Sequence, residues 1–246
     1  MTNLLGASVE LDEIVGFLKS HLQLKEVLQK ISYQKIINQA AQERGLTVTS
    51  EEIQTEANRQ RHEKRLEKAS DTLAWLADQM ISPEDWEKGI REQLLSKKLA
   101  EYLFAKEVEK FFAQNKITFD QLLIYQIIVA DGSLAQEIFY EIEEQEISFY
   151  QAAHLYDIDE KRRQKFGFEG ELYRWQFKPA VAAVVFSSPL GEVTTPLKTN
   201  QGYHLFMVEK FIPAELTPQK YQELLDGMFS DWLASELNYM LHNKSA

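Results

Sequence analysis

The stretch TNQGYHLFMV, residues 199–208, changes character at its centre. Its first four residues, Thr199 to Gly202, are of the types that form turns, and an apolar run follows them. This order predicts a turn that leads into a strand. His204 stands near the start of that strand, where a lone histidine is usually structural. Whether His204 has a functional role depends on which other side chains the fold brings to it.

The segment around this stretch, residues 118–213, has the pattern of a small α+β unit. TFDQLLIYQIIVA (118–130) is rich in β-forming residues and predicts a first strand. Two helices are expected next, one capped by Ser133 and one opened by the capping box Ser148–Gln151. A loop, the segment GELYRW (170–175), a helix over 179–186 and two strands complete the order. This order predicts a compact domain with a mainly antiparallel sheet.

Residues 1–117 have helical rather than strand periodicity. Gly45 is expected to stop one helix, and Thr49 with Glu52 forms a capping box that starts the next. Ser82 followed by Pro83 marks the start of a long helix. The pattern predicts two or three long helices, without an internal β-hairpin, that form an open scaffold.

Helical periodicity resumes after Pro213 and gives the last segment a wide apolar face. Thr217-Pro218 is its expected start. A single helix with so much apolar surface is not stable alone, so it is expected to pack back on the N-terminal helices. The predicted architecture is therefore α+β: an all-helical domain of residues 1–117, completed by residues 214–246, with the domain of residues 118–213 inserted in it.

Composition excludes several classes of function. The 246 residues carry a formal net charge of −11 and include no cysteine, so disulfides, thiolate catalysis and cysteine metal sites are absent. A chain this acidic repels phosphate backbones, and no nucleic-acid partner is expected. The short basic run 161–165, KRRQK, is flanked by acidic residues and is interpreted as a solvated loop. His21, His62 and His242 lack ligand-like spacing, so no metal is expected.

The N-terminus has no early positive charge, and Lys19 is the first lysine. A secretory leader needs such a charge followed by an apolar core. No apolar run approaches the ~20 residues that a membrane span needs. These features predict a soluble, cytoplasmic protein without membrane insertion, although a leader removed from the chain would leave the same sequence.

Residues 119–213 resemble a parvulin domain, the small peptidyl-prolyl cis-trans isomerase fold. The most specific block is PAVAAVVFSSPLGEVTTPLKTNQGYHLFMV (179–208), and YQIIV (125–129), FYQAAHLYDID (149–159) and GELYRW match weaker parvulin motifs. Residues 12–116 resemble the helical chaperone domain of parvulin-linked foldases, the SurA and PrsA class. QKIINQAAQERGLTVTSEEI (34–53) carries that likeness best.

The chemistry of such a domain needs no covalent step and no cofactor. Rotation about an X–Pro bond is slow because the amide is conjugated, with a barrier of roughly 18–20 kcal/mol. A site that holds proline in an apolar pocket and favours the twisted bond accelerates the rotation. The resemblance places the catalytic positions at Gln126, Asp159, Thr199 and His204, and the substrate-binding positions at Leu172, Phe177, Val181, Phe186 and Gln201.

Three of the matched positions depart from the parvulin pattern. Gln126 replaces the first of two paired histidines, Val181 replaces a phenylalanine of the pocket, and Tyr173 replaces a glycine at its rim. Glutamine keeps the capacity to hydrogen bond but cannot take up a proton near neutral pH. Weakened or lost activity and real isomerase activity are therefore both open outcomes. The loop after the first strand, ADGS, lacks basic residues, so no preference for phosphorylated substrates is expected.

Three functions compete at this point. The first is an isomerase that acts on proline-containing polypeptides. The second is a non-catalytic chaperone, a holdase whose helices bind unfolded polypeptides. The third is an accessory that delivers polypeptides to an export system. Long apolar helices at both ends also suggest a homodimer formed through the helical domain.

Overall fold

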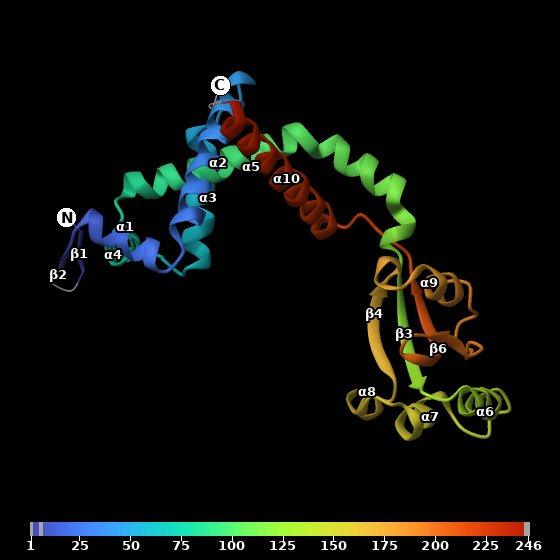
Figure 1. The fold of residues 1–246 in the computed structure, drawn as a ribbon. Helices are drawn as coiled ribbons and strands as arrows, with labels where there is room; N and C mark the ends of the chain where they lie inside the picture. The colour runs from blue at the N-terminus through green and yellow to red at the C-terminus, as the bar shows by residue number, and fades with distance from the viewer. Residues whose placement is uncertain (1, 5–6, 244–246) are drawn as a thin grey trace. The chain divides into compact units, whose positions relative to one another are not determined.

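The computed structural model describes residues 2–4 and 7–243, and these divide into two compact units (Figure 1). The first unit comprises residues 1–108 with residues 218–246, and the second comprises residues 109–217. The second unit is thus inserted between two parts of the first along the chain, as the sequence pattern predicts. Each unit is described by itself below.

The first unit is almost entirely helical. Its elements are β1 (Thr2–Leu4), β2 (Ala7–Val9), α1 (Leu11–Ser20), α2 (Leu24–Glu43), α3 (Ser50–Glu63), α4 (Ala69–Asp78), α5 (Pro83–Asn115, which runs past residue 108) and α10 (Pro218–Asn243). The expectation of helix alone was wrong at the start, where β1 and β2 pair as an antiparallel hairpin. Strands of three residues are too short for a period of two to be recognised in the sequence. The two or three long helices that were expected correspond to α2, α3 and α5, and the shorter helices α1 and α4 accompany them.

The predicted helix boundaries of this unit are confirmed. The Thr49 hydroxyl accepts the backbone N–H of Glu52, and the Glu52 carboxylate accepts the N–H of Thr49, which is the reciprocal pattern of a capping box. Ser82 caps α5 in the same manner, with Pro83 as the first helical residue. Gly45 follows α2 with φ +66°, a left-handed conformation that glycine adopts without strain.

The last helix, α10, packs against α2 within this unit. Leu225, Phe229 and Leu233 are its buried side chains and recur at intervals of four residues. This spacing places them on one side of the helix, toward its neighbours. The expectation that the C-terminal helix returns to the N-terminal helices is therefore confirmed.

The second unit is a four-stranded sheet with helices. Its elements are η1 (Lys116–Phe119), β3 (Gln121–Val129), α6 (Gly132–Glu143), α7 (Phe149–Tyr156), α8 (Glu160–Gln164), β4 (Phe168–Tyr173), η2 (Arg174–Gln176), α9 (Pro179–Val185), β5 (Leu197–Thr199) and β6 (Gly202–Ile212). The strand order is β4-β3-β6-β5, and every neighbouring pair is antiparallel. The α+β class and the antiparallel sheet are as predicted (Figure 1).

Alternate residues of β3 pack into two different cores, one on each face of the sheet. Ile127 and Val129 belong to the core formed with α6 and α7, called here the α6–α7 core. Leu122 and Ile124 belong to the core formed with α9, called here the α9 core. Gln126 lies between these sets and shares the face of Ile124, so its side chain is directed to the α9 side of the sheet.

Two local expectations were wrong in this unit. The cap of α6 is Asp131, whose carboxylate accepts the backbone N–H of Leu134 at 2.9 Å, and Ser133 lies inside the helix. The basic run 161–165 is not a solvated loop, because most of it forms the short helix α8. Arg162 of this helix is largely buried and pairs with two carboxylates, those of Asp157 and Glu169.

Candidate active site

The candidate site is built on β3 and β6, the two central strands of the sheet. Ile128 pairs with His204 and Gln126 pairs with Phe206 across the antiparallel ladder. Gln126 and His204 are therefore diagonal neighbours on one face, a separation that long side chains span. Gly202 allows the turn before β6, since its φ is +132° and a Cβ there would lie 2.4 Å from the carbonyl oxygen of Val129.

His204 is held at both ring nitrogens. Its Nδ1 lies 3.1 Å from Nε2 of Gln126, and its Nε2 lies 2.7 Å from Oγ1 of Thr199. The same hydroxyl accepts the backbone N–H of Gln201 at 3.0 Å. The structure thus brings together four of the predicted positions in one hydrogen-bonded chain that runs from β3 through β6 to the turn.

The direction of the protons in this chain follows from its members. The amide nitrogen of Gln126 can only donate, so Nδ1 of His204 accepts and carries no proton. In a neutral ring the proton then lies on Nε2 and is donated to the oxygen of Thr199. That oxygen already accepts the N–H of Gln201, so the hydroxyl proton of Thr199 remains to be donated elsewhere. Among the residues that the structure describes, no acceptor is found for this proton, and the chain therefore ends in a donor.

Burial favours the neutral ring. His204 is 5% exposed. Burial lowers the pKa of His204 below its ordinary value, and the positive charges of Arg162 and Lys178 lower this pKa further, while Asp157 opposes them. At neutral pH the ring is thus an uncharged link between Gln126 and Thr199. This arrangement does not need a second histidine to fix the tautomer.

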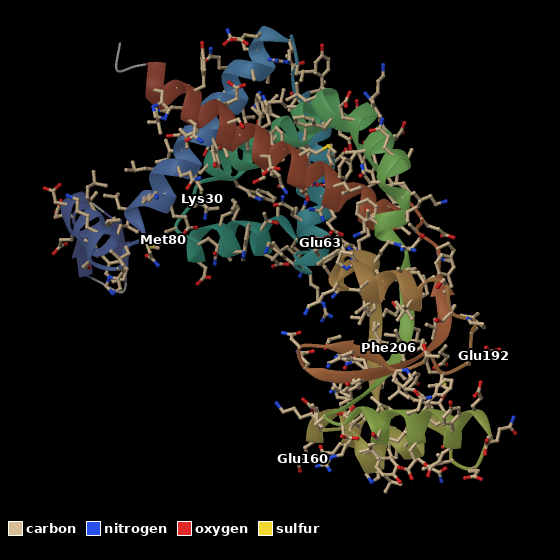
Figure 2. The ribbon with its side chains drawn as sticks, turned by 45° about the vertical axis from the view of Figure 1, so that its right-hand side comes forward. Lys30, Glu63, Met80, Glu160, Glu192 and Phe206 are labelled. Carbon is tan, nitrogen blue, oxygen red and sulfur yellow. The ribbon has the colours of Figure 1, made fainter. Side chains whose placement is uncertain are left out.

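The predicted apolar positions gather beside this chain, around the α9 core. Leu172, Phe177 and Phe186 are partly buried against that core, and Val181 is one of its buried members. Phe206, labelled in Figure 2, is 2% exposed and stacks on His204 with 5.7 Å between ring centroids. The residues expected to bind proline are therefore contiguous with the polar chain.

Phe186 has a neighbour that the sequence did not suggest. The guanidinium carbon of Arg174 lies 3.8 Å from the centre of the Phe186 ring, the geometry of a cation–π contact. Phe177 and Phe211 meet the same ring edge to face. Phe186 thus packs among aromatic and cationic groups, and with Leu172 and Phe177 it forms the partly buried side of the apolar wall, whereas Val181 is buried.

Asp159 lies at the start of α8. Its carboxylate accepts the backbone N–H of Arg162 at 2.9 Å and caps the helix. This hydrogen bond, with smaller contributions from nearby cations, lowers the pKa of the Asp159 carboxyl. Among the described residues, no hydrogen bond joins Asp159 to Gln126, Thr199 or His204. Its resemblance-based role toward the substrate carbonyl stays a prediction.

Asp157 lies two residues before Asp159 and is 2% exposed. The sequence pattern did not predict a role for it. It accepts the backbone N–H of Ile128 at 3.1 Å and that of Asp159 at 2.7 Å. It also pairs with Nε and Nη2 of Arg162, whose Nη1 reaches Glu169 on β4 at 2.9 Å. This buried network joins α8 to the central strand β3, beside His204, and to the edge strand β4. The sequence carries only a weak signal for it, two aspartates separated by one residue.

In the part of the chain that the structure describes, the remaining histidines and carboxylates do not form a metal-binding cluster. His154 is exposed, stacks on Phe166 and lies 3.1 Å from the carbonyl oxygen of Arg163, which fits a packing role. Across the described residues, no three His, Asp or Glu side chains are arranged to hold a metal ion. Within residues 2–4 and 7–243, no helix has the length and apolar character that crossing a bilayer requires.

Comparison with known proteins agrees with this geometry. Residues 130–210 match the family model described as rotamase, PPIC-type PPIase domain. The inserted unit carries a parvulin domain. The resemblance seen in TNQGYHLFMV and its neighbouring segments is thereby confirmed.

The likeness extends beyond the parvulin domain. The foldase protein PrsA of Caldanaerobacter subterraneus is 28% identical over 226 residues, which cover 89% of this chain and 66% of that protein. The foldase protein PrsA of Halalkalibacterium halodurans is 24% identical over 211 residues, or 82% of this chain and 62% of that protein. The chain is PrsA-like, and it spans just under two thirds of the length of these relatives.

Several solved structures cover nearly the whole chain. A structure described for PEB4 and Cj1289 of Campylobacter jejuni, named there as SurA-like chaperones, covers 99% of this chain and 96% of its own. The identity is 20% and the TM-score is 0.39.

Proposed function

We propose that this protein is a foldase whose parvulin domain isomerises X–Pro bonds in polypeptide clients. The observation that supports this most is the hydrogen-bonded chain from Gln126 through His204 to Thr199, which adjoins an apolar wall. Glutamine completes the chain in place of a histidine. The substitution at position 126 therefore preserves the network instead of breaking it.

The mechanism follows from these contacts. Leu172, Phe177 and Phe186, the partly buried residues of the apolar wall, receive the proline ring, which removes apolar surface from water. The free proton of the Thr199 hydroxyl is donated to the substrate near the peptide bond, where it stabilises the form in which amide conjugation is lost. His204 keeps the hydroxyl in that orientation and does not itself exchange a proton with the substrate. No covalent bond is made or broken.

A peptide assay tests the proposal. Cis-to-trans isomerisation of short Ala-Pro and Leu-Pro peptides is followed by NMR exchange spectroscopy, which needs no coupled protease. We expect acceleration above buffer for the wild type and its loss in the double variant Thr199→Val/His204→Ala. An exchange rate equal to that of buffer would contradict the proposal, provided that circular dichroism shows a folded domain.

A second function, binding of unfolded polypeptides without turnover, is favoured by α1. None of the residues of this helix is buried. Its apolar side chains Leu11 and Phe17 are 72% and 57% exposed. Exposed apolar side chains clustered on one helix mark a surface that binds another apolar surface. We propose that α1 contacts unfolded clients or a second copy of the chain.

Suppression of client aggregation separates this function from catalysis. The wild type is expected to delay aggregation of a chemically unfolded enzyme, and Leu11→Ser/Phe17→Ser is expected to lose this effect. The same variant should keep wild-type isomerase rates, because α1 contributes no residue to the parvulin domain. Sedimentation of the variant shows whether the helix instead serves a homodimer.

A further inference from the structure

The loop between α7 and α8 lies beside β3, beyond the last residue of β3 that β4 pairs with. The paired register of β3 with β4 ends at Tyr125. Further along β3, the backbone N–H of Ile158 is donated to the carbonyl oxygen of Ile128 at 2.9 Å, and the N–H of Ile128 is donated to Asp157 at 3.1 Å. Ile128 pairs with His204 on its other side. The loop is therefore attached to the residue of β3 that lies opposite His204.

Asp157 is the centre of these contacts, and its side chain has 0% of its surface exposed. Its carboxylate accepts two backbone N–H groups, those of Ile128 and Asp159. Two more hydrogen bonds come from Arg162, whose Nε and Nη2 lie 2.7 and 3.0 Å from the two carboxylate oxygens. A bidentate contact of this kind defines the orientation of both groups as well as neutralising their charges.

Asp159 is held by the same residues. Its backbone N–H is donated to Asp157 at 2.7 Å, and its carboxylate accepts the backbone N–H of Arg162 at 2.9 Å. Its carbonyl oxygen accepts the N–H of Arg163 at 2.9 Å. Glu160, labelled in Figure 2, is the first residue of α8, so Asp159 stands directly before this helix. The place of the Asp159 carboxylate relative to β3 therefore depends on the pair formed by Asp157 and Arg162.

From these contacts we propose that Asp157 and Arg162 are positioning residues of the isomerase site, which act through Asp159. Asp157 has no exposed side-chain surface with which to contact a client. The pair instead holds the Asp159 carboxylate in one place before the client arrives, and a charge placed in advance needs no reorganisation during the reaction. The inference rests on the proposed isomerase function and on the expectation that Asp159 faces the substrate carbonyl. A purely structural pair would change stability and leave the turnover of the folded protein unaltered.

A double-variant cycle on the full chain tests the inference. Arg162→Lys keeps the positive charge and the backbone N–H that caps α8, but it loses the bidentate contact with Asp157. Isomerisation of an Ala-Pro peptide is followed by NMR exchange at several peptide concentrations, which separates kcat from KM. We expect kcat to fall about tenfold, within the roughly 100-fold that a misplacement of about 1 Å can cost. KM should stay unchanged, because the apolar wall is not altered.

The second arm of the cycle shows whether the effect passes through Asp159. Asp159→Ala is expected to lower kcat at least as much as Arg162→Lys does. The double variant Arg162→Lys/Asp159→Ala should be no slower than Asp159→Ala alone, because a residue that acts through another has no effect once the other is removed. Glu169→Gln removes only the outer partner of Arg162, so it should lower kcat by less. It supplies the same cycle with a milder change if Arg162→Lys does not fold.

Arg163→Lys is the matched control, since it makes the same chemical change one residue later on α8. In the described part of the chain the Arg163 guanidinium forms no ion pair, and this variant should keep the wild-type kcat. Urea unfolding verifies that each variant is folded under the assay conditions.

Four results would overturn the inference and leave the isomerase function intact. They are a wild-type kcat in folded Arg162→Lys, a wild-type kcat in Asp159→Ala, a loss carried by KM alone, and losses that multiply in the double variant. A wild-type chain that does not accelerate exchange would instead refute the isomerase function, and the inference with it. The two failures are therefore distinguished by the rate of the wild type.

Discussion

Gln126 and His204 are joined across two antiparallel strands by a hydrogen bond of 3.1 Å between the glutamine amide nitrogen and Nδ1 of the histidine. Gln126, which stands where the parvulin pattern has a histidine, thus still contacts His204. Because glutamine has no titratable proton, the pair has one fixed polarity over the whole neutral pH range. The consequences for activity, acidity and stability can each be measured.

Replacement of Gln126 by alanine should lower kcat/KM by about tenfold. The expected loss corresponds to one hydrogen bond of about 1–1.5 kcal/mol whose removal leaves His204 free to adopt the other tautomer. NMR exchange on an Ala-Pro peptide measures it. Gln164→Ala, an exposed glutamine on α8, is the matched control and should retain the wild-type rate. Equal rates for the two variants would show that the bond does not contribute to turnover.

The ring of His204 should titrate below the ordinary value of 6.5. Burial lowers the pKa in the folded state only, so the unfolded chain takes up its proton at a higher pH than the folded chain. The contribution of His204 to stability is therefore present above pH 6.5 and declines as the pH falls toward the lowered pKa. Isomerase activity should decline over the same range. A ring titration followed by NMR checks this, and a midpoint at or above 6.5 would be incompatible with it.

Asp157 and Asp159 should differ in their contribution to stability although one residue separates them. Asp157→Ala leaves Arg162 buried without its closest partner and is expected to cost about 3–5 kcal/mol. Asp159→Ala removes only a helix cap at an exposed position and is expected to cost clearly less than Asp157→Ala. Urea unfolding followed by circular dichroism compares the two. Similar losses for both variants would mean that the buried network is not a main support of the site.

Gly202 should not tolerate a side chain. A Cβ at this position would lie 2.4 Å from the carbonyl oxygen of Val129, on the strand that carries Gln126, and φ is +132°. Gly202→Ala is expected to destabilise the domain by more than the roughly 1–3 kcal/mol of backbone strain alone. Gly191→Ala is the control, because Gly191 also has a positive φ, +78°, but open space around it. Thermal unfolding of both variants should show the larger loss at Gly202.

Much of the fold was predictable because its signals are local. The capping boxes at Thr49 and Ser148 and the Ser82-Pro83 start depend on residues three or four positions apart, and each begins a helix where expected. The antiparallel order follows from short connections between β-rich segments. The N-terminal hairpin and α8 escaped prediction because three to five residues carry too little periodicity.

The part of the site that lies on β6 and on the turn before it was predictable from the sequence. Thr199, Gln201 and His204 lie within six residues, and their contacts follow from a hairpin-like turn into a strand. Gln126 lies 78 residues from His204, and its ability to replace a histidine became evident only with the 3.1 Å contact. The role of Asp157 was not visible, because burial of one aspartate rather than its neighbour is decided by packing.

The sequence by itself determined the order of elements, the class of fold and the residues of the turn before β6, since these depend on neighbouring residues and backbone preferences. Only the tertiary structure decided the partners of His204 and the burial of Asp157 with Arg162. Such features depend on which side chains meet after the chain has folded. The energy of a buried polar group is set by those partners and not by its position along the chain.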